Sequence, residues 1–156
     1  MKLAPSEPWR ISSRLARHTF TEEDAKTYLI CSAVLVLLYF ALALNVSMTR
    51  GRTKTGIGVG DDPSGPMNKA VRAHGNAAEY VPIFVALFLY FLLAGAGGWI
   101  TWVVVIVTIC RVLHAIGMLM TRSFTAPPHP LRGVGAAGTY LGGFALGIAL
   151  LMRVVF

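Results

Sequence analysis

A single carboxylate inside a long apolar stretch is the feature of this sequence that most directly indicates chemistry. Glu79 is the only acidic residue between Pro63 and the C-terminus, and the next charged residue after it is Arg111. A charged side chain within a membrane is costly unless it is paired or hydrated, so such a residue generally marks a functional site. Glu79 is therefore the first candidate for a binding group.

Polar residues precede this carboxylate at helical spacing. Arg72, Asn76 and Glu79 fall on one face of a helix, and His74 lies to the side of that face. Pro82 follows, and a proline inside a helix removes one backbone hydrogen bond and can bend the helix. This segment can therefore present a cation, an amide and a carboxylate to one small polar ligand.

A second set of cations occurs later in the chain. Arg111 and His114 share one face of a further helix, and Arg132 begins the last apolar stretch. Counted from the intervening turn, Glu79 and Arg111 differ in depth by less than about 8 Å, so we expect them to meet directly or through a water molecule. The cations exceed the one carboxylate, and guanidinium groups bind carboxylates with two parallel hydrogen bonds. A bound anionic ligand would balance the excess positive charge. We expect no metal ion at this site.

A purely structural interpretation of the same residues stays open. A buried Glu–Arg pair can fix the register of two helices without binding anything. Arg72 and Arg132 can extend to the lipid headgroups, and the two histidines can be satisfied core residues.

The elements that must position these residues follow from hydropathy. The sequence is 55% hydrophobic and 13% charged, with a mean hydropathy of +0.63, whereas a soluble domain carries about 25% charged residues. Residues 73–120 would span about 72 Å as one helix, more than twice the roughly 30 Å hydrocarbon core. The chain must therefore turn back, and the glycine-rich residues 95–98 are the expected turn.

These observations predict an all-α integral membrane protein with a four-helix transmembrane bundle. The expected helices cover residues 22–48, 66–94, 99–122 and 131–156, within a membrane domain of residues 22–156. Residues 1–21 are expected to form a polar tail or an interfacial helix, and residues 1–26 lack the apolar centre of a cleavable signal peptide.

Several local signals support these limits. Thr21 and Asp24 have the spacing of a capping box that opens the first helix, and Trp99 and Trp102 fit an interfacial aromatic belt. Two glycine pairs at four-residue spacing in the last helix predict close helix packing, within one protomer or between protomers; they are Gly138 with Gly142 and Gly143 with Gly147. Cys31 and Cys110 are expected to be reduced core residues.

The charge distribution limits the partners. The net charge of +7 resides in the loops and the N-terminal segment, where it favours contact with anionic membrane lipids. No basic stripe with interleaved aromatic residues occurs, so nucleic acid is not an expected partner. The cations close to the span ends modestly favour a cytoplasmic side for the first and third connecting loops.

Residues 72–82, read together with Arg111-Val-Leu-His114 and Arg132, resemble the MAPEG family, the membrane-associated proteins in eicosanoid and glutathione metabolism, and bacterial members in particular. The resemblance covers residues 27–156. It implies a four-helix protomer, a homotrimer and a glutathione site between neighbouring protomers towards the cytoplasm. It also implies that Arg132 is the catalytic residue that stabilises the thiolate, and that the residues that hold glutathione are Arg72, His74, Asn76, Glu79, Arg111 and His114.

The resulting expectation is a bacterial inner-membrane glutathione transferase, with peroxidase activity as a variant, that conjugates glutathione to a hydrophobic substrate. Gly75, Met118 and Ala136 depart from the pattern of glutathione-using animal members, which carry arginine or tyrosine there. Tyr80 and Tyr140 are expected to point elsewhere. A non-catalytic protein of the same fold that binds a lipid-like ligand or a protein partner is the alternative. A transporter is disfavoured because no paired broken helices are evident.

Overall fold

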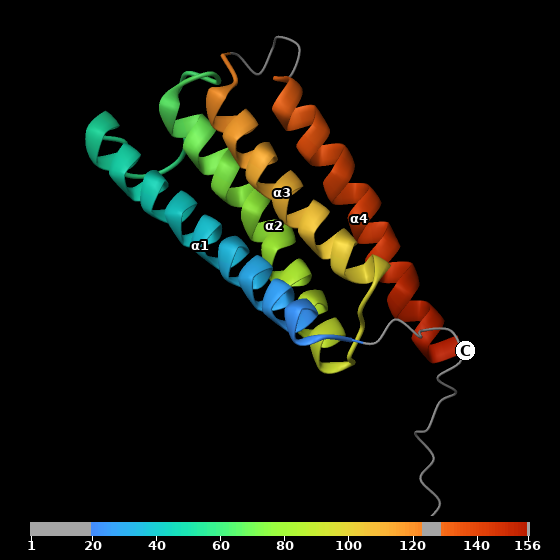
Figure 1. Cartoon of the computed structure of the whole chain (residues 1–156). Helices are drawn as coiled ribbons and strands as arrows, with labels where there is room; N and C mark the ends of the chain where they lie inside the picture. The colour runs from blue at the N-terminus through green and yellow to red at the C-terminus, as the bar shows by residue number, and fades with distance from the viewer. Residues whose placement is uncertain (1–19, 123–128, 156) are drawn as a thin grey trace, which may run out of the picture.

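Four helices make up the computed structural model, which describes residues 20–122 and 129–155. They are α1 (Glu22–Thr53), α2 (Pro66–Leu93), α3 (Trp99–Met120) and α4 (Pro130–Val155) (Figure 1). Each is long and apolar enough to cross a membrane. The expectation of an all-helical chain with four transmembrane helices is confirmed. Of the tail or interfacial helix expected over residues 1–21, residues 1–19 lie outside the described residues.

Two helix ends differ from the sequence-based expectation by two residues or more. α1 continues to Thr53 rather than ending near residue 48, because Arg50 and Arg52 lie in its last turn, where cations interact favourably with the negative end of the helix dipole. Lys54 then ends the helix in the left-handed conformation, with φ of 53°. α3 ends at Met120 rather than near residue 122.

The start of α1 has the expected capping box. The hydroxyl of Thr21 accepts a hydrogen bond of 3.1 Å from the Asp24 amide, and the Asp24 carboxylate accepts one of 3.0 Å from the Thr21 amide. These two bonds satisfy donors that the first turn of a helix leaves without intrahelical partners. The start of the first transmembrane helix is therefore fixed by hydrogen bonds between neighbouring residues, as predicted.

The turn between α2 and α3 forms at the predicted glycines. Gly95 and Gly98 have φ of 61° and 69°, a region that glycine enters without steric cost. Next to this turn, the Tyr28 hydroxyl of α1 donates a 2.8 Å hydrogen bond to the Ala96 carbonyl. The turn is thus tied to α1 as well as to the helices that it joins.

The helices pack in unequal pairs. α3 lies mainly along α4, α1 lies mainly along α2, and α3 also contacts α1 and α2. Successive helices run in opposite directions (Figure 1). Large apolar side chains that are fully buried, among them Tyr28, Phe88 and Phe91, fill the half of the bundle nearest the turn at residues 95–98. The polar candidate residues therefore lie in the opposite half.

Glycine brings α3 and α4 into close contact. A methyl group added at Gly138 would lie 2.2 Å from the Cys110 sulfur, and one at Gly142 would lie 2.1 Å from a methyl group of Val107. These positions confirm the first predicted glycine pair as a packing surface. In the second pair, a methyl group added at Gly143 would make only an ordinary contact with Phe84. One added at Gly147 would have no neighbour within 4 Å in the described chain.

Candidate functional site

Arg111 is the centre of the polar contacts between α2 and α3. Its side chain is 1% exposed. Its Nη2 donates a 2.8 Å hydrogen bond to Oδ1 of Asn76 and a longer one of 3.4 Å to the Asn76 carbonyl. The Arg111 Nε is buried and has no hydrogen-bond partner within the described residues. A buried guanidinium is thus held by a neutral amide, while its buried Nε–H group remains without a partner among the described residues.

The expected direct contact between Arg111 and Glu79 does not occur. Glu79 is exposed, and no hydrogen bond or ion pair joins it to another residue in the described part of the chain. Asn76 lies one turn before Glu79 on the same face of α2 and takes the place nearest to Arg111. The rotation of α2 about its axis decides which of the two residues contacts Arg111. Helical spacing alone could not distinguish Asn76 from Glu79, because both lie on the same face.

The contact with Arg111 also orients the amide of Asn76. Because a guanidinium can only donate, the atom facing it is the amide oxygen, and the Asn76 amino group points elsewhere. This amino group makes no hydrogen bond within the described ranges. Asn76 can therefore offer donors to an external acceptor such as a carboxylate.

Two tyrosines join this cluster, contrary to the expectation that they point elsewhere. The Arg111 guanidinium lies 5.0 Å from the centre of the Tyr80 ring, a distance typical of a cation–π interaction. The Tyr80 ring centre is 6.1 Å from that of Tyr140 on α4. Tyr80 directly follows Glu79 and lies four residues after Asn76, which was the available sequence signal. No comparable spacing connects Tyr140 to the motif.

His114 and Arg132 are brought together at the start of α4. The Nδ1 atom of His114 lies 3.0 Å from the Arg132 carbonyl oxygen; since a carbonyl only accepts, Nδ1 is the donor. Gly117 permits this approach, because a methyl group there would lie 2.4 Å from the Arg132 backbone nitrogen. His114 thus fixes the backbone of Arg132 rather than its guanidinium.

His74 is separated from this arrangement. Its ring centre lies 5.0 Å from that of Tyr39 on α1, and its buried Nδ1 has no hydrogen-bond partner within the described residues. The structure therefore places His74 against α1, while Arg111 and His114 lie on α3. A role in ligand binding for His74 remains a prediction from the family resemblance.

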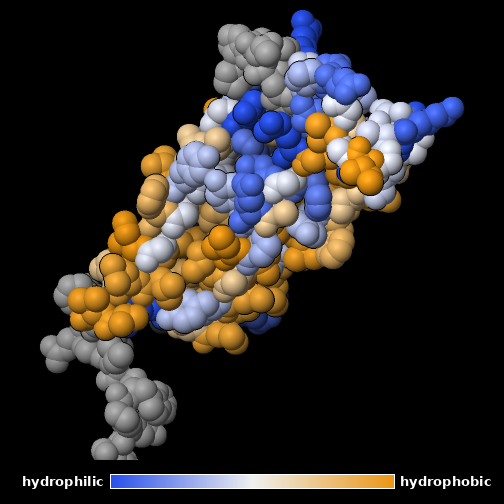
Figure 2. Space-filling view, turned by 180° about the vertical axis from the view of Figure 1, so that it is seen from behind, coloured by the Kyte–Doolittle hydropathy of each residue, from blue (hydrophilic) through white to orange (hydrophobic). Residues whose placement is uncertain are grey.

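The remaining candidate, Arg72, is exposed near the start of α2. Hydrophilic side chains gather at the end of the molecule where α2 and α4 begin, and hydrophobic ones cover most of the rest of this face (Figure 2). Across residues 20–122 and 129–155, no three His, Cys, Asp or Glu side chains are grouped closely enough to hold a metal ion. The arrangement is suited to an anionic organic ligand.

Comparison with known proteins agrees with this architecture. The sequence profile of the MAPEG family matches residues 28–152. The inner membrane protein YecN of Escherichia coli strain K12 is 31% identical over 93 residues, which cover 60% of this chain and 63% of YecN, and YecN of Escherichia coli O6:H1 matches to the same extent. The match therefore spans less than two thirds of these relatives. No solved structure matches the chain.

The family match extends from α1 into the last turns of α4. It includes the polar face of α2, the Arg111–His114 segment and Arg132. The four helices make the chain a multi-pass membrane protein. Taken together, the helix arrangement and the matched residues show that this chain belongs to the MAPEG family.

Proposed function

We propose that this chain is a membrane-bound glutathione transferase that conjugates glutathione to a hydrophobic electrophile. The observation that carries the proposal is the buried guanidinium of Arg111, whose hydrogen bonds go to a neutral amide rather than to a carboxylate. A buried cation is stabilised by a nearby anion, and glutathione supplies two carboxylates. The exposed polar face of α2 lies beside this cation.

In this proposal, each charged group of glutathione has a matching side chain. The Asn76 amino group and the guanidinium of Arg72 are donors for the carboxylates, and the exposed Glu79 carboxylate is an acceptor for the ammonium group. Arg111 acts through its neighbours, because it orients the amide of Asn76 and lies over the ring of Tyr80. Arg111 is therefore a positioning residue in this proposal.

Arg132 is the proposed catalytic residue. A guanidinium near the thiol of glutathione favours the thiolate, which is the nucleophile in conjugation. The thiolate forms a carbon–sulfur bond with the electrophile, and the leaving group departs with the bonding electrons. His114 contributes by holding the Arg132 backbone through its carbonyl, so the chemistry needs no nucleophile from the protein.

The proposed assembly is a homotrimer with the glutathione site between protomers. Arg72 and Glu79 are exposed in a single chain, so a neighbouring copy could enclose a ligand against α2. The proposed location is a bacterial inner membrane, because the relative YecN is named as an inner membrane protein. The first and third loops are assigned to the cytoplasm, and the hydrophobic substrate enters from the surrounding lipid.

Binding of glutathione to the purified protein tests this function. We expect saturable binding at millimolar glutathione, together with a rise in the ultraviolet absorbance of the thiolate. The variant Arg132→Ala should bind glutathione but lose the thiolate signal, because it lacks the stabilising charge. Arg122→Ala is the control, since Arg122 is exposed just after α3. Absence of saturable binding would exclude the transferase, and a thiolate signal that persists in Arg132→Ala would exclude the assigned role of Arg132.

A non-catalytic MAPEG protein is the second candidate, and one observation favours it. Met118 is 5% exposed and packs in the apolar core, so α3 offers no hydroxyl group where glutathione-using animal members carry tyrosine. Such a protein would bind a lipid-like ligand or a protein partner through the same fold. Glutathione binding separates the two candidates.

A further inference from the structure

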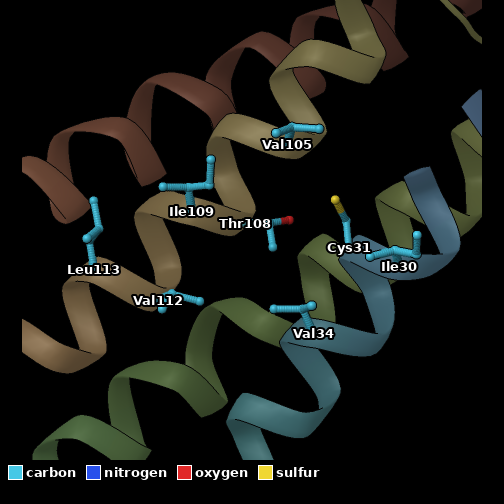
Figure 3. Close-up of a pocket in the computed structure, with 8 residues that line it drawn as sticks. All are labelled: Ile30, Cys31, Val34, Val105, Thr108, Ile109, Val112 and Leu113. Carbon is cyan, nitrogen blue, oxygen red and sulfur yellow. The ribbon is translucent and has the colours of Figure 1, made fainter.

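A cavity of about 320 Å³ lies between α1 and α3 (Figure 3). Its walls are aliphatic apart from Cys31 and Thr108, which approach it from the two facing helices. The Thr108 hydroxyl already donates a 2.8 Å hydrogen bond to the Val104 carbonyl. The cavity therefore offers mainly hydrocarbon contact, and the Cys31 thiol, a weak donor, is the one other polar group in its walls. Its lining residues are Ile30, Cys31, Val34, Val105, Thr108, Ile109, Val112 and Leu113.

A second cavity of about 410 Å³ adjoins the first, because Val105 lines both. Its lining is mixed and more polar than that of the first cavity: the other lining residues are Thr21, Asp24, Thr27, Gly98, Thr101 and Trp102. Within it, the Thr101 hydroxyl donates a 2.7 Å hydrogen bond to the Asp24 carboxylate. These two neighbouring cavities, together called the groove below, have hydroxyl and carboxylate groups in their walls near the start of α1 and aliphatic walls further along it.

The position of this groove relative to a membrane follows from its helices. Trp99 and Trp102, which are 55% and 70% exposed, mark the headgroup layer at the polar end. From Asp24 to Val34 the groove follows α1 for about 15 Å, which is about half of a 30 Å hydrocarbon core. The whole groove thus reaches from the membrane surface to about the middle of the bilayer, with its apolar part at the deeper end.

The groove is separate from the candidate glutathione site. At 3.6 residues per turn, Arg111 and His114 point away from the face of α3 that carries Val105, Ile109 and Val112. Arg111 contacts α2, and His114 contacts the start of α4. An occupant of the groove would therefore not compete with a ligand on the polar face of α2.

We propose that this groove binds a membrane phospholipid, with one acyl chain between α1 and α3 and the ester and head groups in the polar cavity. The change from polar to apolar walls within one leaflet matches such a molecule. A transmembrane helix of a second copy fits less well, because it would cover the Asp24 carboxylate and the threonine hydroxyls with apolar side chains, which is costly. The assignment does not depend on the glutathione proposal.

Retention of a defined lipid by the full chain tests this site. The purified protein in detergent is mixed with dioleoyl phosphatidylethanolamine, and bound lipid is counted by native mass spectrometry. Ile109→Trp places an indole in the apolar cavity; Ile106→Trp is the matched control, because these side chains are 53% and 52% exposed on the same helix and only Ile109 lines the groove. We expect about a tenfold loss of bound lipid in Ile109→Trp, since excluding even two methylene groups weakens binding by about that factor, and no loss in Ile106→Trp.

Further measurements make the result decisive if one variant fails to fold. Val34→Phe fills the cavity from α1, and circular dichroism shows whether each variant keeps its helices. Thr101→Val, which removes a hydroxyl from the polar cavity, should also reduce lipid binding. Equal retention in all folded variants, or no retained lipid in the unmodified protein, would overturn the proposal. A changed oligomeric mass in Ile109→Trp with unchanged lipid would instead assign the groove to a contact between copies.

Discussion

At the scale of single residues, the contact between Asn76 and Arg111 has two separable functions. It satisfies a buried guanidinium, which affects folding, and it orients the Asn76 amino group, which affects a ligand. The observed hydrogen bond of 2.8 Å accounts for the first. The second belongs to the proposed glutathione site, so the two functions call for different substitutions.

Replacement of Asn76 by aspartate separates these functions. In Asn76→Asp, the carboxylate still accepts a hydrogen bond from Arg111, so the thermal stability should be close to that of the original protein. The variant lacks the amino donor and carries a negative charge beside a negatively charged ligand, so glutathione affinity should fall by at least about tenfold. Asn76→Ala, in contrast, should lose about 1–3 kcal/mol of stability, because Arg111 loses its partner. Thermal unfolding and calorimetric titration measure the two effects, and equal glutathione affinity in Asn76→Asp would remove Asn76 from the site.

Glu79 gives a second test at this scale, because the sequence left open whether it locks two helices together. In the structure it is exposed and makes no hydrogen bond or ion pair within the described residues. Glu79→Gln should therefore change the unfolding free energy by no more than about 0.5 kcal/mol. Glutathione affinity should still fall, since the ammonium group loses its carboxylate partner. A large loss of stability in detergent would instead support a structural role for Glu79.

At the scale of elements, the contact between α3 and α4 places Arg132 beside the end of α3. Gly135 packs directly against the backbone of α3, because a methyl group there would be 2.6 Å from both the Cys110 carbonyl oxygen and the His114 amide nitrogen. These are backbone atoms, which cannot rotate away as a flexible side chain can. The two helices would have to separate, and the contact between His114 and the Arg132 carbonyl would be disturbed.

Alanine substitution of two glycines in α4 tests this contact. Gly135→Ala should destabilise the protein by about 1–3 kcal/mol, the usual cost of overpacking, and should lower the thiolate signal assigned to Arg132. Gly147→Ala is the matched control, since a methyl group at Gly147 has no neighbour within 4 Å in the described chain, and alanine favours helix formation by up to about 1 kcal/mol. Thermal unfolding of both variants in detergent compares them. Equal unfolding temperatures would show that α4 can move away from α3 at little cost.

At the scale of the whole molecule, a single chain leaves its proposed binding face open. Arg72 and Glu79 are exposed, and large apolar side chains such as Phe144 and Leu151 of α4 are 72% and 62% exposed. Lipid can cover apolar side chains inside a membrane, but an exposed carboxylate near this depth calls for a polar partner. A neighbouring copy and the ligand together would provide that environment.

The oligomeric state of the protein can be measured directly. Native mass spectrometry or light scattering of the detergent-solubilised protein should give three times the chain mass of 16.8 kDa. Glutathione should stabilise this trimer against dissociation on dilution, because a ligand between protomers binds only the assembled form. A monomeric protein that binds glutathione with undiminished affinity would place the site within one chain.

The sequence by itself determined the membrane class, the four helices, the capping box at Thr21 and the glycine turn at residues 95–98. Those features depend on local hydropathy, helix periodicity and backbone freedom, which neighbouring residues decide. Only the tertiary structure decided that Arg111 bonds to Asn76 instead of Glu79, that Tyr80 and Tyr140 join the cluster, and that His74 packs against α1. Each of these outcomes depends on how far a helix is rotated about its axis and how closely it approaches the next one. Helical spacing places side chains on a face, but contacts between helices, such as those at Gly135 and Gly138, decide what that face meets.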